Sequence, residues 1–196
     1  MTEEYAFNAS THTYTMTRKG VTHTLPSVTT ILRDVLPQWT PNDPWYMQRG
    51  TEVHKAAEII ASGQTPVCDP AIKGHVDGIM KFYSDFDVIP VAAEHQVYHP
   101  RYAYAGTYDL CALCAWHGLC MIDFKSSGDE RATALQLAAY TLDGLVGAPA
   151  DKPISTGIMV TLPGDGTYKA KVFNLGVWWP RWRAVLTVYN LKRVRV

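Results

Sequence analysis

The stretch Gly106-Thr-Tyr-Asp109, followed by Met121-Ile-Asp123-Phe-Lys125, decides the fold prediction for this chain. Both segments belong to runs that are typical of neighbouring β-strands, Tyr104 to Ala115 and Leu119 to Lys125. The residues between the runs, Trp116-His117-Gly118, predict a three-residue hairpin loop in which glycine takes the left-handed position. The sequence therefore predicts an antiparallel hairpin at the centre of the domain.

The predicted hairpin brings two carboxylates and one lysine to a single face. Because strand side chains alternate, Lys125 shares the face of Asp123. A loop of odd length places Asp109 on that face as well, and we expect Asp109 opposite Lys125 and Cys111 opposite Asp123. Carboxylates suit Mg²⁺, which also binds waters and a substrate phosphate. Taken alone, however, an Asp-Phe-Lys strand end is more often an exposed edge with a solvated ion pair.

The segments on either side of the hairpin predict helices and further strands. The expected elements are, in chain order, a hairpin turning at Gly20 (about 10–25), a helix capped by Ser27, helices at 45–62 and 72–86, a strand at 91–98, the central hairpin, a helix from Arg131 to Val146, strands at 154–162 and 168–175, and a helix at about 178–192. This order predicts a mixed α/β fold with a mixed central β-sheet flanked by helices.

The composition is that of one ordinary globular domain. A chain of 196 residues, 47% hydrophobic and 18% charged, suits a single core, so we expect residues 1–196 to form one domain. The N-terminal hairpin and the C-terminal helix would be additions to it. The sequence shows neither a signal peptide nor an apolar run long enough to span a membrane, and we expect a cytoplasmic location. Because the net charge is zero, a nucleic-acid partner would need a local basic groove.

The C-terminal segment is both basic and aromatic. It carries Arg181, Arg183, Lys192, Arg193 and Arg195 without an acidic residue. Such a run either follows a phosphate backbone or, more commonly, forms the solvated face of a helix. Likewise, Trp178, Trp179 and Trp182 could stack on bases, but aromatic residues at this spacing usually belong to the core.

The four cysteines are expected to be reduced thiols in a cytosolic chain. They are Cys68, Cys111, Cys114 and Cys120. Residues three apart on a strand point to opposite faces, so Cys111 and Cys114 cannot chelate an ion together unless the strand is broken. The spacing therefore favours buried thiols over a zinc site.

Five short motifs follow one another in an order that resembles a known family. They are Arg49-Gly-x-x-x-His54-x-x-x-Glu58, Glu94 on a strand, Gly106-x-x-Asp109, Asp123-x-Lys125 and Gln136-x-x-x-Tyr140. With the preceding Leu25-Pro-Ser-Val-Thr-Thr-Ile-Leu32, they resemble the RecB-like branch of the PD-(D/E)XK nucleases, which includes phage exonucleases and CRISPR-associated RecB-like nucleases. The resemblance spans most of the chain and implies a restriction-endonuclease-like core.

The resemblance also implies a metal site. Asp109 and Asp123 would bind Mg²⁺ together with the main-chain carbonyl of Phe124, and His54 would be an additional ligand. Imidazole is an uncommon ligand for Mg²⁺ and suits Mn²⁺ better, so Mn²⁺ should substitute. Without the carboxylates, His54 would more often be an ordinary histidine of a helix surface or core.

The remaining motif residues receive roles in catalysis and DNA binding by the same resemblance. Lys125 would orient or deprotonate the attacking water, and Glu94 would act through water or a second metal. Glu58 would position His54 or its helix. The implied DNA-binding residues are Gln136, Tyr140, Arg49 and Ser126. Outside the family context, Gln136 and Tyr140 would be an ordinary pair on a helix.

The implied activity is metal-dependent hydrolysis of DNA, with an exonuclease acting on ends in phage-type recombination, repair or replication. DNA is the expected partner, beside a candidate recombination or single-strand-binding protein. Iron–sulfur members of this branch place three cysteines after the Gln-x-x-x-Tyr helix, whereas all four cysteines here precede Gln136, so no cluster is expected. A structure-specific or nicking endonuclease and a catalytically silent DNA-binding module remain as alternatives.

Overall fold

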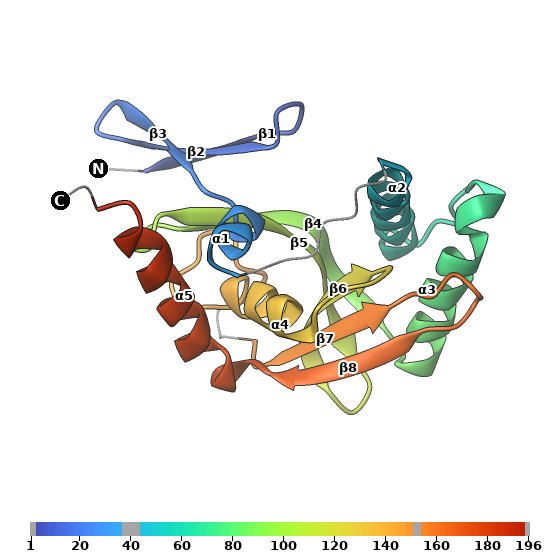
Figure 1. The fold of residues 1–196 in the computed structure, drawn as a ribbon. Coiled ribbons are helices and arrows are strands. Elements are labelled where there is room, and N and C mark those ends of the chain that lie inside the picture. The colour runs from blue at the N-terminus through green and yellow to red at the C-terminus, as the bar shows by residue number, and fades with distance from the viewer. Residues whose placement is uncertain (1–2, 37–43, 151–153, 195–196) are drawn as a thin grey trace.

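A five-stranded mixed β-sheet forms the centre of the structure, with helices on both faces and a separate three-stranded antiparallel sheet beside it (Figure 1). The computed structural model describes residues 3–36, 44–150 and 154–194. The order in the central sheet is β4-β5-β6-β7-β8, and only the β6–β7 pair is parallel. The predicted α/β class with a mixed central sheet is confirmed.

The elements of the described chain follow the predicted order closely. They are β1 (Glu4–Asn8), β2 (Thr13–Arg18), β3 (Val21–Leu25), α1 (Val28–Val35), α2 (Pro44–Ala61), the 3₁₀ turn η1 (Pro70–Ile72), α3 (Lys73–Asp85), β4 (Ile89–His99), β5 (Tyr104–Cys114), β6 (Gly118–Lys125), α4 (Glu130–Ala139), β7 (Thr156–Thr161), β8 (Lys169–Asn174), the 3₁₀ turn η2 (Leu175–Val177) and α5 (Trp179–Leu191). The predicted cap of α1 is confirmed, because the Ser27 hydroxyl accepts the Thr30 N–H at 3.0 Å. The loop expected between the first two helices falls at 37–43, outside the described residues.

Helix α4 is shorter than expected, ending at Ala139 instead of Val146. Its last carbonyls find a side-chain partner, since the Thr141 hydroxyl donates to the Leu137 carbonyl at 3.0 Å. The same hydroxyl accepts the Trp179 indole N–H at 3.0 Å, which ties the end of α4 to α5. Leu142 is still buried beyond this point, so the apolar period runs through the turn and conceals the end of the helix.

The N-terminal sheet contains one strand more than the predicted hairpin. The β2–β3 hairpin turns at Lys19 and Gly20, with φ angles of 51° and 75°, which is typical of the two-residue turns that match strand twist. Strand β1 adds to this hairpin with Phe7 opposite Tyr14. Only two rings mark β1, Tyr5 and Phe7, and this is too short a pattern to separate a strand from an extended terminus.

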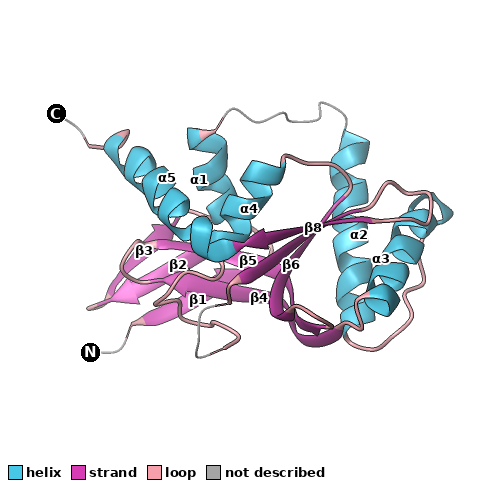
Figure 2. Ribbon diagram, turned by 90° about the horizontal axis from the view of Figure 1, so that it is seen from below, coloured by secondary structure: helices cyan, strands magenta, loops and turns pink. Residues whose placement is uncertain are grey.

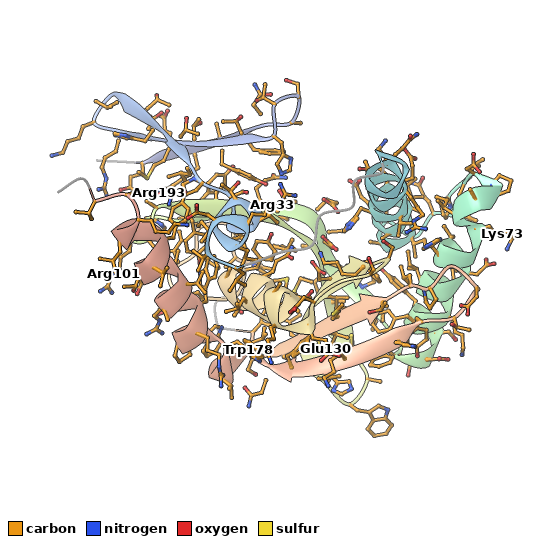
Figure 3. All side chains as sticks on the ribbon, in the orientation of Figure 1. Arg33, Lys73, Arg101, Glu130, Trp178 and Arg193 are labelled. Carbon is orange, nitrogen blue, oxygen red and sulfur yellow. The ribbon has the colours of Figure 1, made fainter. Side chains whose placement is uncertain are left out.

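Different helices cover the two faces of the central sheet (Figure 2), and each face has its own apolar cluster. Helices α1, α4 and α5 pack over one face, where Met121 and Trp182 are buried. Helices α2 and α3 pack over the other face, where Phe82 and Phe124 are buried. Trp178, at the start of α5 in Figure 3, and Trp179 pack against the first cluster, so the three tryptophans belong to the core.

The register of the central hairpin corrects the sequence prediction. Cys114 pairs with Gly118, so the three-residue loop is 115–117 and begins one residue earlier than expected. Trp116 adopts the left-handed φ of 65° inside this loop, while Gly118, with φ 69°, is already the first residue of β6. The register therefore differs by two residues from the predicted one.

The shift preserves the predicted parity of the strand pairing. Since Leu110 pairs with Ile122, Asp109 comes opposite Asp123, and the predicted pairings of Asp109 with Lys125 and of Cys111 with Asp123 are wrong. A change of two residues keeps the parity of the pairing, because side chains alternate with a period of two. The pairing parity predicted for Asp109 and Asp123 is therefore kept.

Packing accounts for Cys111 and Cys114, and ion pairs account for two residues of the C-terminal basic run. All four cysteines are free thiols, and Cys111 and Cys114 belong to different core clusters, as expected from their spacing. Lys192 and Arg193 each lie 3.1 Å from a carboxylate oxygen of Asp34 in α1, and Figure 3 shows Arg193 at that end of α5. Arg195 falls outside the described residues.

No helix in the described part of the chain is long and apolar enough to cross a membrane.

Candidate metal centre

A pocket of about 540 Å³ lies where α2, α4 and the β4–β5 pair approach the N-terminal sheet. Six of the residues singled out from the sequence line it: His54, Glu58, Glu94, Asp109, Gln136 and Tyr140. The remaining lining comes from His12, Tyr14, Ser27, Thr29, Gly50, Thr51, Lys55, Gly106 and Thr107. Residues that are far apart in sequence therefore meet in one cavity.

Three side chains in this pocket form a group that could hold a metal ion. One ligand atom each from His54, Glu94 and Asp109 lies within 4.8 Å of the others. His54 Nδ1 is 3.2 Å from Asp109 Oδ2 and 4.0 Å from Glu94 Oε1. Their side chains are 33%, 31% and 10% exposed for His54, Glu94 and Asp109, so the group is shielded but open to a small ligand.

Helix α2 presents His54 to the pocket because its neighbours anchor the helix. Val53 and Ala57 are buried in the core on the α2–α3 side of the sheet, which leaves His54 and Glu58 toward the pocket. Glu58 is exposed, and no hydrogen bond joins it to His54 among the described residues. The pKa of Glu94 is raised by burial and by the charge of Asp109, and the negative charge of Glu58 adds to this shift.

Glu94 reaches the pocket from a strained position in β4. Its φ is 47°, in the left-handed region that non-glycine residues seldom adopt. The pairing of the flanking residues places Glu94 opposite Asp109. Strand alternation also breaks at Asp109, since Tyr108 and Leu110 belong to different core clusters. Such strain concentrates at functional sites, where the surrounding structure holds it in place.

Asp109 is held from two sides. Its Oδ2 accepts the Phe124 N–H at 2.9 Å and lies beside His54 Nδ1. Phe124 makes this contact through its main-chain N–H. The bond joins β5 to β6 and fixes the carboxylate at the base of the metal group.

Asp123 and Lys125 form an ion pair next to Asp109. Lys125 Nζ lies 2.8 Å from Asp123 Oδ2 and donates to Asp123 Oδ1 at 3.0 Å. The Asp123 side chain is only 2% exposed, while that of Lys125 is 25% exposed. Neither residue belongs to the pocket lining of the described chain. The metal group found in the described chain contains Glu94 beside Asp109 and does not include Asp123.

The charges of the group act strongly on one another. Attraction to Asp109 raises the pKa of His54 to about 9, against the opposing effect of burial. Burial and the negative charge of Asp109 raise the pKa of Glu94 to about 7. Burial also raises the pKa of Asp109, but His54 and Lys125 outweigh it, so the net pKa of Asp109 is lowered.

A divalent cation fits this donor set. Two carboxylates converge on one imidazole, and the proton on His54 supplies the positive charge that balances them. A cation bound to the same atoms would replace that proton and would remove the repulsion that raises the pKa of Glu94. One nitrogen and two carboxylate ligands suit Mn²⁺ and other first-row ions as well as Mg²⁺, so the group does not by itself select an ion.

Metal binding should release protons and strengthen with pH. His54 and Glu94, with pKa values of about 9 and 7, carry protons at neutral pH that a metal must displace. We expect the affinity for Mn²⁺ to rise about tenfold per pH unit from pH 7 towards the His54 pKa of about 9, and to level off above it. Calorimetric titration in buffers of different ionisation enthalpy measures the released protons.

The His54→Asn variant is the matched comparison for this titration. It should bind Mn²⁺ more weakly and with a smaller pH dependence, since one displaceable proton is gone. An affinity for Mn²⁺ that does not change with pH in the wild type would show that His54 is not a ligand.

Gln136 and Tyr140 lie together on the α4 side of the pocket. The Gln136 amide donates to the Tyr140 hydroxyl at 3.4 Å, and both side chains are almost fully buried. The Tyr140 ring occupies space that Gly106 leaves open, because a Cβ at residue 106 would lie 2.6 Å from Tyr140 Cε1. The glycine of the Gly106-x-x-Asp109 motif is thus needed for the placement of Tyr140.

Gly106→Ala should therefore destabilise the protein by about 1–3 kcal/mol, the usual range for overpacking a core position. Chemical denaturation measures the change in the free energy of unfolding. Gly50→Ala is the control, since nothing lies within 4 Å of its Cβ position in α2, and it should be neutral or stabilising by up to about 1 kcal/mol. Equal free energies of unfolding for Gly106→Ala and wild type would show that Tyr140 can move aside without loss of stability.

Two residues with an implied DNA-binding role lie outside the pocket lining of the described chain. Burial lowers the pKa of His75 in α3, and the positive charge of Arg49 lowers it further. Ser126 directly follows β6 and is half-buried. Conversely, no sequence motif marks His12, Tyr14 and Thr107 as pocket residues. Their place in the pocket depends on how the N-terminal sheet docks against β5.

No protein-family model matches the sequence, and a comparison with curated proteins finds no match. The chain is a mixed α/β protein with a five-stranded mixed sheet and a His54–Glu94–Asp109 group that could hold a metal ion.

Proposed function

We propose that this chain is a metal-dependent nuclease that hydrolyses DNA phosphodiester bonds, of the RecB-like PD-(D/E)XK type. The supporting observation is that the His54–Glu94–Asp109 group lies beside the Asp123–Lys125 ion pair. A metal site, an adjacent ammonium group and an open pocket are the parts that phosphodiester hydrolysis requires.

His54, Glu94 and Asp109 would hold the metal ion. When bound, the ion supplies Lewis-acid chemistry, in that it polarises the phosphate and lowers the pKa of water. The Phe124 N–H keeps the Asp109 carboxylate in place by its 2.9 Å hydrogen bond. The strained backbone of Glu94 brings the second carboxylate to the same ion.

Lys125 acts as a hydrogen-bond donor. Burial lowers its pKa, but the carboxylates of Asp123 and Asp109 outweigh this effect, and the net pKa is raised. The side chain therefore remains an ammonium ion at neutral pH and cannot take a proton from water. It orients the attacking water and offsets the charge that develops on the phosphate.

Asp123 holds Lys125 in position. Burial, followed by the charge of Asp109, raises the pKa of Asp123 to about 6, although Lys125 opposes this shift. Asp123 is therefore mostly ionised at neutral pH and keeps both oxygens within 3.0 Å of the ammonium group. Gln136 and Tyr140 would contact the DNA backbone from the α4 side of the pocket.

Digestion of end-labelled linear DNA and closed circular DNA tests the proposal. With Mg²⁺ or Mn²⁺, an exonuclease shortens single- or double-stranded linear DNA from its ends and leaves the circle intact. Cutting of the circle would instead assign a structure-specific or nicking endonuclease. If all substrates stay intact with either ion, the nuclease proposal is wrong and the DNA-binding module is favoured. A recombination or single-strand-binding partner stays a prediction of the resemblance.

A further inference from the structure

The pocket has an aromatic wall that the proposed chemistry does not use. Phe7 and Tyr14 stack with ring centroids 4.7 Å apart. The His12 ring packs edge-on against both of them, at 5.2 Å from Phe7 and 5.5 Å from Tyr14. His12 and Tyr14 line the same pocket as the metal group. We refer to Phe7, His12 and Tyr14 as the aromatic wall.

The aromatic wall is fixed relative to the metal group. Tyr14 is 2% exposed, and its hydroxyl hydrogen-bonds to Thr107 Oγ1 at 2.8 Å. Thr107 lies on β5 two residues before Asp109, so this bond connects the N-terminal sheet to the strand that carries the metal ligand. The wall also continues into the sheet core, where the Tyr14 and Tyr98 ring centroids are 6.1 Å apart.

His12 is the exposed ring of the wall. It directly precedes β2 and adopts a φ of 50°, a left-handed conformation that His tolerates better than most residues. Its Nε2 is 3.4 Å from the Tyr14 hydroxyl. Contacts with two rings and one hydroxyl hold the imidazole at the pocket although the residue itself is exposed.

The chemistry of the wall differs from that of the rest of the pocket. Glu58, Glu94 and Asp109 bring carboxylates to the pocket, and these repel a phosphate that has no metal ion beside it. The aromatic wall carries no carboxylate and presents ring surface. Such a surface suits an uncharged planar group, and every nucleobase has one.

We propose that the aromatic wall, with His12 as its contact ring, binds an unpaired nucleobase next to the scissile phosphate. This inference rests on the proposed function and deepens it, since it names single-stranded or frayed DNA as the substrate class. A base that is still paired and stacked in a duplex cannot offer its face to His12. Stacking of this kind is independent of sequence.

Equilibrium binding of single strands tests the inference, with Ca²⁺ in place of Mg²⁺ to keep the DNA uncleaved. Fluorescence anisotropy compares a labelled oligothymidylate with an abasic strand of equal length, which keeps the phosphates and lacks the bases. His12→Asn removes the ring but tolerates the left-handed backbone, His12→Phe keeps a ring, and His12→Lys replaces the ring with a positive charge. His23→Asn on β3 of the same sheet is the control for an exposed histidine.

We expect His12→Asn to weaken binding of oligothymidylate about fivefold or more, the lower end for loss of one stacked base. His12→Phe should bind close to wild type, His12→Lys should resemble His12→Asn, and His23→Asn should have no effect. On the abasic strand, wild type and His12→Asn should bind equally.

Three results would overturn the inference. Wild-type affinity of His12→Asn for oligothymidylate excludes a role for the ring, and if that variant still cleaves DNA the proposed function stands. Wild-type affinity of His12→Lys together with loss in His12→Phe would assign a phosphate contact instead. If wild type binds neither strand and cleaves no DNA, both proposals fail together.

Discussion

Asp109→Asn should abolish DNA cleavage, with the rate falling by about a thousandfold or more, while the protein stays folded. Asp109 contacts both His54 and the β6 backbone, since its Oδ2 lies 3.2 Å from His54 Nδ1 and accepts the Phe124 N–H at 2.9 Å. An asparagine of the same shape keeps an oxygen for that N–H but lacks the charge that binds a cation. A metal ion contributes several kcal/mol to the stabilisation of such a transition state, which corresponds to this loss of rate.

The measurement is the initial rate of digestion of end-labelled DNA at saturating Mn²⁺, together with the melting temperature. Asp77→Asn is the matched control, because Asp77 is an exposed carboxylate of α3 that pairs with Lys73 away from the pocket. It should digest DNA at the wild-type rate. A folded Asp109→Asn protein with substantial activity would remove Asp109 from the metal site.

Lys125→Met should reduce the cleavage rate by about a hundredfold to a thousandfold and leave Mn²⁺ binding almost unchanged. Loss of one preorganised donor to a developing charge has an effect of this size. Lys125 is outside the His54–Glu94–Asp109 group, so the metal keeps its ligands. The effect should therefore fall on the rate at saturating metal and substrate rather than on the affinity for the ion.

The pH profile of Lys125→Met provides a second readout. Without the ammonium group, only the weaker attraction of His54 opposes burial and the charge of Asp109, so the pKa of Asp123 should rise above the wild-type value of about 6. Since Asp123 acts through Lys125 in the proposal, the pH dependence that its ionisation gives to the wild-type rate should be absent from the residual activity. Lys73→Met, which removes an exposed lysine of α3, should change neither the rate nor the profile. Loss of Mn²⁺ binding in Lys125→Met would contradict the proposal that Lys125 acts on the water and the phosphate and takes no part in metal binding.

Much of the central sheet could be predicted from the sequence because local pattern determines it. Alternation and turn residues identified β5, β6 and the pairing parity of Asp109 and Asp123. The register itself could not be predicted, because it depends on which of two residues takes the left-handed position in the loop. Here Trp116 does so within the loop, and pairing begins at Gly118.

The candidate site was accessible from the sequence only in part. Motif order placed His54, Glu94 and Asp109 in one family context, but only the fold brings their ligand atoms within 4.8 Å. The left-handed φ of Glu94 and its position opposite Asp109 have no sequence signal. His12 was missed because it enters the pocket through docking of the N-terminal sheet, a tertiary contact that no local pattern reveals.

The proposed metal-dependent cleavage is tested most directly by titrating Mn²⁺ into the protein in the presence of end-labelled DNA, and following metal binding and cleavage in the same samples. We expect cleavage to rise in proportion to the occupancy of the His54–Glu94–Asp109 site, and both signals to be lost in Asp109→Asn. DNA that stays intact when the wild-type site is saturated with Mn²⁺, or cleavage that persists when a chelator has removed the metal, would contradict the proposal.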